Sequence, residues 1–281
     1  LKIKIYAMIS VSKKNIEKFK KEGIYKSKKL NIRSFKVYGD GALGSRGAVL
    51  KSPYCDDPHN YGILRTSAED LKFYAKEIAE MGFQMNTHAI GDSTISVLLN
   101  EYKKILKDID DPRWRIEHSQ VVDVNEFELY NEKILPSIQP THATSDMYWA
   151  YDRLGSRIKG AYAFKDLLNS SSRVALGTDF PVEKVNPFHT FYSSVERKDL
   201  YGYPENGFQM ENSLTREETL KGMTIWGAYF NFEEHEKGSL EVGKSADFIV
   251  LNQNIMEVEA DLIPNTEVIQ TYVDGELVYS K

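Results

Sequence analysis

The chain has 281 residues, of which 41% are hydrophobic and 27% are charged, and its net charge is −5. This length suits one large α/β domain, or such a domain with a smaller one beside it. Lysine and arginine are spread along the chain, which argues against a nucleic-acid partner. No run reaches the roughly 18 apolar residues of a membrane helix. The single cysteine, Cys55, excludes an intrachain disulfide framework and favours a reducing cytoplasm.

Short apolar runs alternate with amphipathic helices as far as about residue 235, as repeated β-α units do. Strands are predicted at residues 1–9, 34–38, 83–88, 134–139 and 174–177, with a further strand ending at His118. Helices are predicted after the capping box Thr66–Glu69, at residues 92–107, and from a second capping box at Thr215 to about residue 230. The opening residues alternate like a strand without an initiator methionine, so we expect the chain to be cut from something longer.

After Gly238 the residue pattern becomes typical of β-strands and turns. Residues 239–251 are predicted to form a turn followed by a strand, and residues 268–279 a hairpin with Asp274-Gly275 at its turn. So few strands do not make a stable sheet alone, so this tail needs partner strands.

Four apolar runs each end at a residue type that can hold a metal, namely Lys36, His88, His118 and Asp179. In a barrel of parallel strands the C-terminal strand ends converge on one face, so these residues can meet although the outermost two are about 140 positions apart. A lysine inside such a barrel is desolvated and nucleophilic, and it can add carbon dioxide to form a carbamate that bridges two metals. Asp179 can bind a metal and move a proton.

Each of these residues also has a simpler interpretation. A lysine at a barrel rim can extend to solvent, and an aspartate two residues before a proline can serve an Asx-turn or a helix cap. A single histidine at a strand end is commonly structural, and the pairing of His88 with His118 favours the metal. Strand alternation places Arg115 and Glu117 on the face opposite His118, which predicts an ion pair outside the barrel.

The chain resembles the amidohydrolase superfamily, specifically the YtcJ-like metal-dependent hydrolases (amidohydrolase family 3). The matching stretches are residues 36–46, 88–92, 115–120, 139–146 and 177–182. They occur in order over essentially the whole chain. The resemblance implies a TIM-type (β/α)₈ barrel whose two-metal centre hydrolyses carbon–nitrogen bonds other than peptide bonds, in an amide, N-acyl or cyclic amide substrate. Zinc is the divalent metal that suits these ligands.

The resemblance also implies roles for particular residues. Lys36 becomes the carboxylated bridging ligand, His88 and His118 hold one metal, and Asp179 serves the other metal and acts as general base and acid. Substrate contacts are implied for four further residues, namely Asp40, Arg46, His142 and Asp146.

One family feature has no counterpart here. The first barrel strand of the family ends in a His-x-His pair, and none of the six histidines of this chain has that spacing. Residues 1–9 align best with the third strand, so we expect the first two strands and the N-terminal half of the sandwich to be absent. Residues 1–236 then form an incomplete (β/α) barrel catalytic domain and residues 237–281 the C-terminal part of a β-sandwich.

An incomplete barrel changes what we expect of the chain itself. It should bind at most one metal, be inactive or nearly so in isolation, and form homo-oligomers or associate with a missing N-terminal segment. Two alternatives remain open: a non-catalytic barrel scaffold that binds or regulates, and a one-metal deaminase or hydrolase using His88, His118 and Asp179. The joint presence of all four predicted ligands argues against the scaffold.

Overall fold

The computed structural model of the chain describes residues 2–281, which divide into two compact units. The sheet unit comprises Lys4–Ile138 and Tyr148–Ser172. The C-terminal unit comprises the N-terminal residues through Ile3, Gln139–Met147 and Arg173–Lys281. None of the helices in the described residues is both long enough and apolar enough to cross a membrane. The predicted domain boundary after residue 236 stays a prediction.

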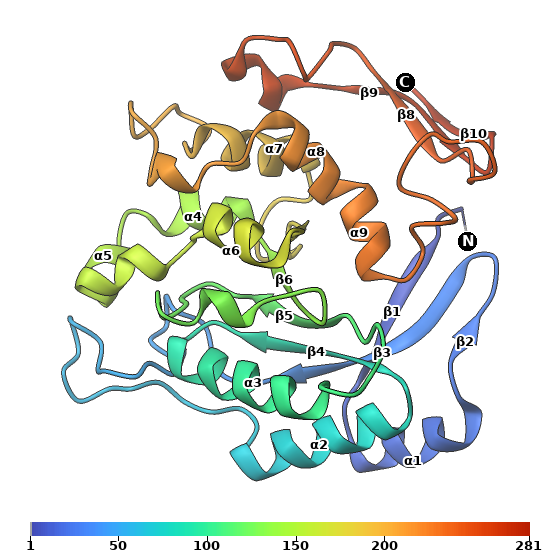
Figure 1. Cartoon of the computed structure of the whole chain (residues 1–281). Helices are drawn as coiled ribbons and strands as arrows, with labels where there is room; N and C mark the ends of the chain where they lie inside the picture. The colour runs from blue at the N-terminus through green and yellow to red at the C-terminus, as the bar shows by residue number, and fades with distance from the viewer. Residues whose placement is uncertain (1) are drawn as a thin grey trace. The chain divides into compact units, whose positions relative to one another are not determined.

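The sheet unit is built on parallel strands. Its strands are β1 (Ile5–Ser10), β2 (Tyr25–Lys26), β3 (Leu30–Tyr38), β4 (Gln84–Ala89), β5 (Trp114–His118) and β6 (Ile134–Ile138). Its helices are α1 (Lys13–Glu22), α2 (Ala68–Glu80), α3 (Asp92–Ile105), α5 (Ala150–Leu154) and α6 (Phe164–Ser171), with 3-10 turns at Phe127–Leu129 and Gly155–Gly160. Strands β1, β3, β4, β5 and β6 lie side by side in that order, all parallel, and β2 pairs antiparallel with β3 (Figure 1).

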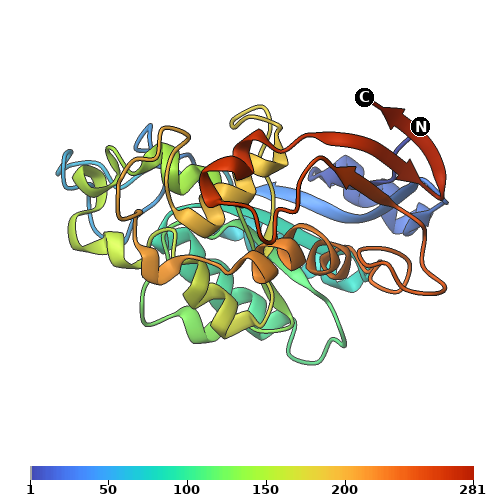
Figure 2. The same cartoon turned by 90° about the horizontal axis from the view of Figure 1, so that it is seen from above.

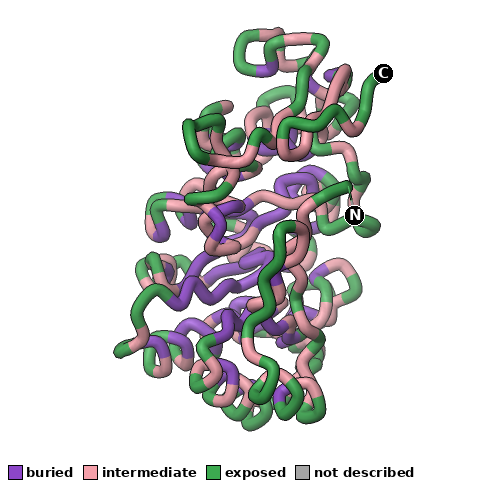
Figure 3. Tube along the Cα trace, turned by 90° about the vertical axis from the view of Figure 1, so that its right-hand side faces the viewer, coloured by how far each residue is buried: buried purple, intermediate pink, exposed green. Residues whose placement is uncertain are grey.

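One face of this sheet is apolar and packs against helices. The ring of Phe35 lies 6.1 Å from Phe19 of α1 and 5.3 Å from Phe83, all edge to face. Trp114 of β5 packs at 4.8 Å against Tyr102 of α3. Figure 1 shows α2 and α3 along this side, and Figure 3 shows the central strands in the colour of buried residues. Because alternate strand residues point to opposite faces, the other face receives the polar side chains.

The predicted strands of this unit are confirmed, with small shifts at their ends. The first predicted strand begins at Leu1, which lies outside the described residues, and β1 begins at Ile5. The first capping box is wrong by one residue. Ser67 caps α2, its hydroxyl accepting the Asp70 N–H at 3.1 Å, whereas the Thr66 hydroxyl donates to the Tyr38 carbonyl.

The C-terminal unit combines helices with a small antiparallel sheet. Its helices are α4 (Pro140–Asp146), α7 (Pro187–Glu196), α8 (Arg216–Met223) and α9 (Ile225–Phe230), with 3-10 turns at Met210–Asn212 and Ala260–Asn265. Its strands are β7 (Ala175–Leu176), β8 (Phe248–Leu251), β9 (Val268–Val273) and β10 (Glu276–Ser280). Strands β8, β9 and β10 pair antiparallel and stand out in red shades in Figure 2. The predicted hairpin is confirmed, and Asp274 and Gly275 have φ of 54° and 79°, as a tight two-residue turn requires.

The predicted last helix is interrupted. Its capping box at Thr215 is confirmed, but the helix ends at Met223, and Thr224 with φ −127° and ψ −95° separates α8 from α9. The apolar stripe continues across this break, so the sequence pattern does not reveal it.

Removing the α8 cap should lower the stability of the chain. The Thr215 hydroxyl accepts the Glu218 N–H at 3.1 Å, and the Glu218 carboxylate accepts the Thr215 N–H at 2.8 Å. We expect Thr215→Ala to lower the free energy of unfolding by about 1 kcal/mol in urea titrations. The control Thr215→Ser keeps the hydroxyl and should lie within about 0.3 kcal/mol of the wild type. Equal losses in the two variants would contradict the assignment.

Candidate metal centre

Three predicted metal ligands stand at the C-terminal ends of neighbouring parallel strands. Lys36 lies near the end of β3, His88 near the end of β4, and His118 closes β5. The His88 and His118 rings meet edge to face with centroids 4.6 Å apart. Lys36 lies close enough for its positive charge to disfavour protonation of His88. We call Lys36, His88 and His118 the strand-end cluster.

His118 reaches this position through an unusual backbone. The register pairs it with Ala89, which by alternation belongs to the helix-covered face. However, His118 and Ser119 have φ of 78° and 43°, so the chain turns in the left-handed region directly at the strand end. Such a conformation costs about 1–3 kcal/mol for a non-glycine residue. Two hydrogen bonds hold the turn: Ser119 Oγ donates to the Ile116 carbonyl at 3.0 Å, and the Tyr130 hydroxyl donates to Ser119 Oγ at 2.9 Å.

The electrostatics of His88 suit a metal ligand. Burial and then the charge of Lys36 lower the pKa of His88 to about 4, so its imidazole is neutral at pH 7, which is the form that binds metals. Its Nε2 atom is buried with no hydrogen-bond partner among residues 2–281. A buried polar atom left in this way is costly, and a bound cation would satisfy it. The residues present therefore fit a metal.

The polar face of the sheet continues below the strand-end cluster. Register places Lys36 beside Asn86, and His88 beside Glu117. The Asn86 side chain is fully buried and its amide atoms have no hydrogen-bond partner within the described part of the chain. The sequence prediction overlooked Asn86, although it lies two positions before His88 and so shares its face.

The predicted location of the Arg115–Glu117 ion pair is wrong. The pair itself exists, with Arg115 Nε 3.1 Å from Glu117 Oε1 and both side chains buried. Burial opposes ionisation of Glu117, but the charges of Arg115 and Lys36 hold the pKa of its carboxyl below the ordinary value. The Glu117 carboxylate also accepts a hydrogen bond from the Ser137 side chain. The pair therefore lies on the polar face, and it is His118 that departs from the alternation.

Asp179 belongs to the C-terminal unit, where it lies close to His142. It follows β7 with φ 54°, and its Oδ2 atom lies 3.9 Å from His142 Nε2. Its carboxylate is 40% exposed, whereas burial lowers the pKa of His142 to about 4. Asp146 ends α4 in the same unit, and the Ser145 hydroxyl donates to both Asp146 Oδ1 and Glu183 Oε1, at 3.4 and 2.7 Å. Their predicted roles stay predictions.

Asp40 and Arg46, the other two predicted substrate contacts, are held inside the loop that follows β3. The Arg46 guanidinium donates to both oxygens of Asp56, at 3.1 and 2.8 Å, and Arg153 also donates to Asp56. The Arg46 hydrogen bond holds the pKa of Asp56 below its ordinary value. The Asp40 side chain is fully buried, and its oxygens accept backbone N–H groups. These contacts favour loop anchoring over the substrate contacts that the resemblance implied.

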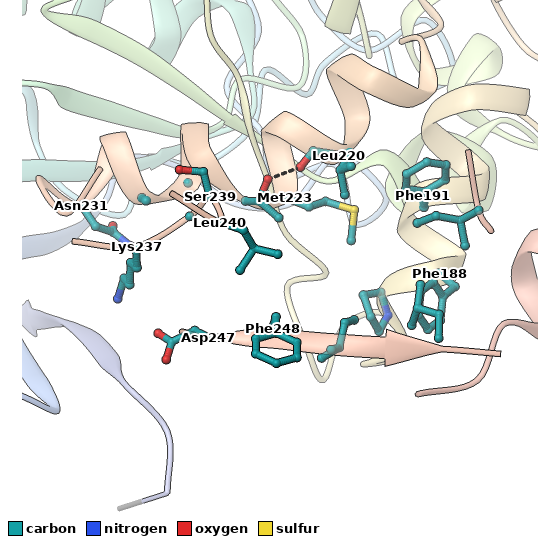
Figure 4. Close-up of a pocket in the computed structure, with 18 residues that line it drawn as sticks. Phe188, Phe191, Leu220, Met223, Asn231, Lys237, Ser239, Leu240, Asp247 and Phe248 are labelled. Carbon is teal, nitrogen blue, oxygen red and sulfur yellow. Dashed lines mark hydrogen bonds between the residues drawn. The ribbon is translucent and has the colours of Figure 1, made fainter. Parts of the chain in front are cut away.

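No three histidine, cysteine, aspartate or glutamate side chains among residues 2–281 gather closely enough to hold a metal ion. The two histidines of the strand-end cluster therefore have no third ligand of these four types among the described residues. A cavity of about 810 Å³ in the C-terminal unit contains none of the predicted site residues. Figure 4 shows Phe188 and Phe191 of α7 at one end of it and Lys237 and Asp247 at the other.

The parallel β-α architecture, with a lysine and two histidines at the carboxyl ends of its strands, defines a partial (β/α)₈ barrel with its functional edge at those ends. The chain belongs to the amidohydrolase family, whose profile matches residues 3–279. This result confirms the predicted family.

Individual relatives agree with this assignment. Protein LONG AFTER FAR-RED 3 of Arabidopsis thaliana is 32% identical over 263 residues, which cover 92% of this chain and 45% of the relative. The amidohydrolase YtcJ of Bacillus subtilis is 32% identical over 250 residues, covering 88% of this chain and 47% of the relative. The chain thus spans about half the length of the curated relatives it matches.

A solved structure supports the fold. An uncharacterised metal-dependent hydrolase from Pyrococcus horikoshii superposes with a TM-score of 0.79 at 27% identity, covering 92% of this chain and 52% of that one. The predicted fold class, a partial barrel of the amidohydrolase kind with strands of a small second sheet, is confirmed.

Proposed function

We propose that this chain contributes to metal-dependent hydrolysis of a carbon–nitrogen bond in a small amide, N-acyl or cyclic amide substrate. The observation that carries the proposal is the strand-end cluster, in which two imidazoles meet beside a lysine at the carboxyl ends of parallel strands. Membership of the amidohydrolase family supports the reaction class.

The chain's own residues have distinct parts in this proposal. His88 and His118 hold one divalent metal, for which zinc is our candidate, and Lys36 completes the site as a carbamate. When bound, the metal lowers the pKa of a water molecule so that hydroxide is available near neutral pH. Asp179, in the C-terminal unit, is our candidate for the residue that would move a proton to the leaving nitrogen. His142, 3.9 Å from Asp179, orients the carboxylate or the substrate.

We also propose that the 281 residues alone are nearly inactive, act in the cytoplasm, and work as a homo-oligomer or with a further segment. The described residues offer one cluster of a lysine with two histidines and no group of three histidine, cysteine, aspartate or glutamate side chains that could hold a further metal. Hydrolysis at a two-metal centre needs both sites, so binding of one metal by this chain should be separable from turnover.

Zinc uptake and amine release should be measured on the same preparation. We expect about one zinc per chain, and amine release from N-formyl amines that is zinc-dependent yet roughly 10³-fold or more below that of a 22% identical relative, the N-substituted formamide deformylase of Arthrobacter pascens, assayed alongside. A rate equal to that relative would overturn the partial-site proposal. Absence of both zinc binding and hydrolysis would leave the non-catalytic scaffold as the function.

A further inference from the structure

The Asp40 carboxylate has an unusual set of partners. Its side chain is 0% exposed. Oδ1 accepts the Ile90 N–H at 3.0 Å, and Oδ2 accepts the N–H groups of Gly91 and Val49, both at 2.9 Å. Hydrogen bonds to an ionised acceptor are about twice as strong as neutral ones. Three of them on one buried carboxylate form a rigid junction.

The donors come from segments that flank the strand-end cluster. Ile90 and Gly91 directly follow β4, two and three residues after His88, and Gly91 is the N-cap of α3. Asp40 itself lies four residues after Lys36, just beyond β3. The Gly39 N–H also donates to the His88 carbonyl at 2.8 Å. Asp40 therefore ties the end of the strand carrying Lys36 to the end of the strand carrying His88.

Close packing leaves this junction little freedom. A Cβ atom on Gly39 would lie 2.9 Å from the His88 carbonyl oxygen, and one on Gly91 would lie 2.1 Å from that of Val49. Asp40 Oδ1 lies 3.7 Å from His88 Nε2, which is beyond hydrogen-bonding distance. The carboxylate thus acts on His88 through the backbone, and it has no oxygen exposed to a substrate.

We infer that Asp40 is a positioning residue that fixes His88 for metal binding, through the three backbone N–H groups it accepts around the end of β4. This inference rests on the proposed role of His88 as a metal ligand. Partners that hydrogen-bond the ring of a metal-binding histidine typically contribute 10–100-fold to metal affinity, and we expect a group that holds the histidine through its backbone to act in the same direction.

The test compares two near-isosteric substitutions of buried carboxylates. Asp40→Asn replaces one accepting oxygen by an amide NH₂ that faces backbone donors, so we expect a roughly 10–100-fold weaker zinc affinity in competition with a chromophoric chelator. The matched control is Asp92→Asn. Asp92 is also buried and accepts backbone N–H groups, among them that of Lys51 at 2.8 Å. This control should lose stability but keep its zinc affinity within about twofold.

A metal-free readout separates this inference from the proposed function. In the apo chain with isotope-labelled histidine, the His88 ring should give one sharp set of NMR signals in the wild type and in Asp92→Asn, but broadened or multiple sets in Asp40→Asn. If the wild type binds no zinc, the proposed metal centre is wrong, and the ring signals still decide whether Asp40 positions His88. Unchanged His88 signals in Asp40→Asn, with zinc affinity within twofold wherever zinc binds, would overturn the inference.

A second measurement needs no variant, in case Asp40→Asn does not fold. The Val49 amide lies on a loop, and its N–H donates to Asp40 Oδ2. Zinc binding to the wild-type chain should therefore slow hydrogen exchange of the Val49 amide together with those of Ile90 and Gly91. Protection of Ile90 and Gly91 without Val49 would contradict a junction centred on Asp40.

Discussion

The His88→Ala variant is expected to retain roughly a tenth or less of the zinc that the wild-type chain keeps after the same dialysis. A structural or catalytic zinc site needs at least three protein ligands, and the strand-end cluster offers no spare one. His118→Ala should behave in the same way, because the two rings meet at 4.6 Å and a shared ion needs both. Elemental mass spectrometry of the purified variants measures the result directly.

The matched control is His235→Ala. The His235 side chain is 93% exposed and its Nε2 lies 3.5 Å from Glu234, so it belongs to the solvent-facing surface of the C-terminal unit. Its replacement should leave the zinc content unchanged. Zinc retained in both His88→Ala and His118→Ala, or lost in His235→Ala to the same extent, would show that the metal binds elsewhere.

The sequence was sufficient to place the strand-end cluster because two regularities combine there. Apolar runs located the strands, and parallel strands bring their carboxyl ends to one edge, so Lys36 and His88 were expected as neighbours. The faces of β5 were not predictable in the same way. The alternation was counted from His118, whose left-handed backbone puts its ring on the face of Arg115 and Glu117. The pattern of hydrophobic residues does not reveal that one residue has a positive φ.

Other differences between expectation and structure have equally local causes. Ser67 caps α2 instead of the predicted Thr66, because the Thr66 hydroxyl donates a hydrogen bond to the Tyr38 carbonyl, 28 residues earlier. For Asp40, the family resemblance implied a contact with the substrate. The Asp40 carboxylate accepts the N–H groups of Val49, nine positions later, and of Ile90 and Gly91, 50 and 51 positions later. Only tertiary structure reveals contacts of this kind.

The second large effect is expected on stability, when the buried ion pair between Arg115 and Glu117 is broken. We expect Arg115→Met to lower the free energy of unfolding by about 3–5 kcal/mol, because it leaves the Glu117 carboxylate buried without the cation 3.1 Å away. The double variant Arg115→Met/Glu117→Leu should recover much of this loss, since it removes the uncompensated charge and fills the space with apolar atoms. Urea titrations of wild type, both single variants and the double variant give the coupling energy.

An exposed pair provides the control for this cycle. Lys221 and Glu217 lie 2.6 Å apart on α8, with side chains 47% and 72% exposed. Solvent screens such a pair, so Lys221→Met should change the free energy of unfolding by about 0.5 kcal/mol or less. If Arg115→Met were as mild as Lys221→Met, water would have to reach Glu117, which would contradict the burial of this ion pair. A large loss in the single variant that the double variant reverses would instead show that Glu117 is held ionised beneath His88 and Lys36. Its negative charge then offsets part of the positive charge that a bound metal adds at the strand ends.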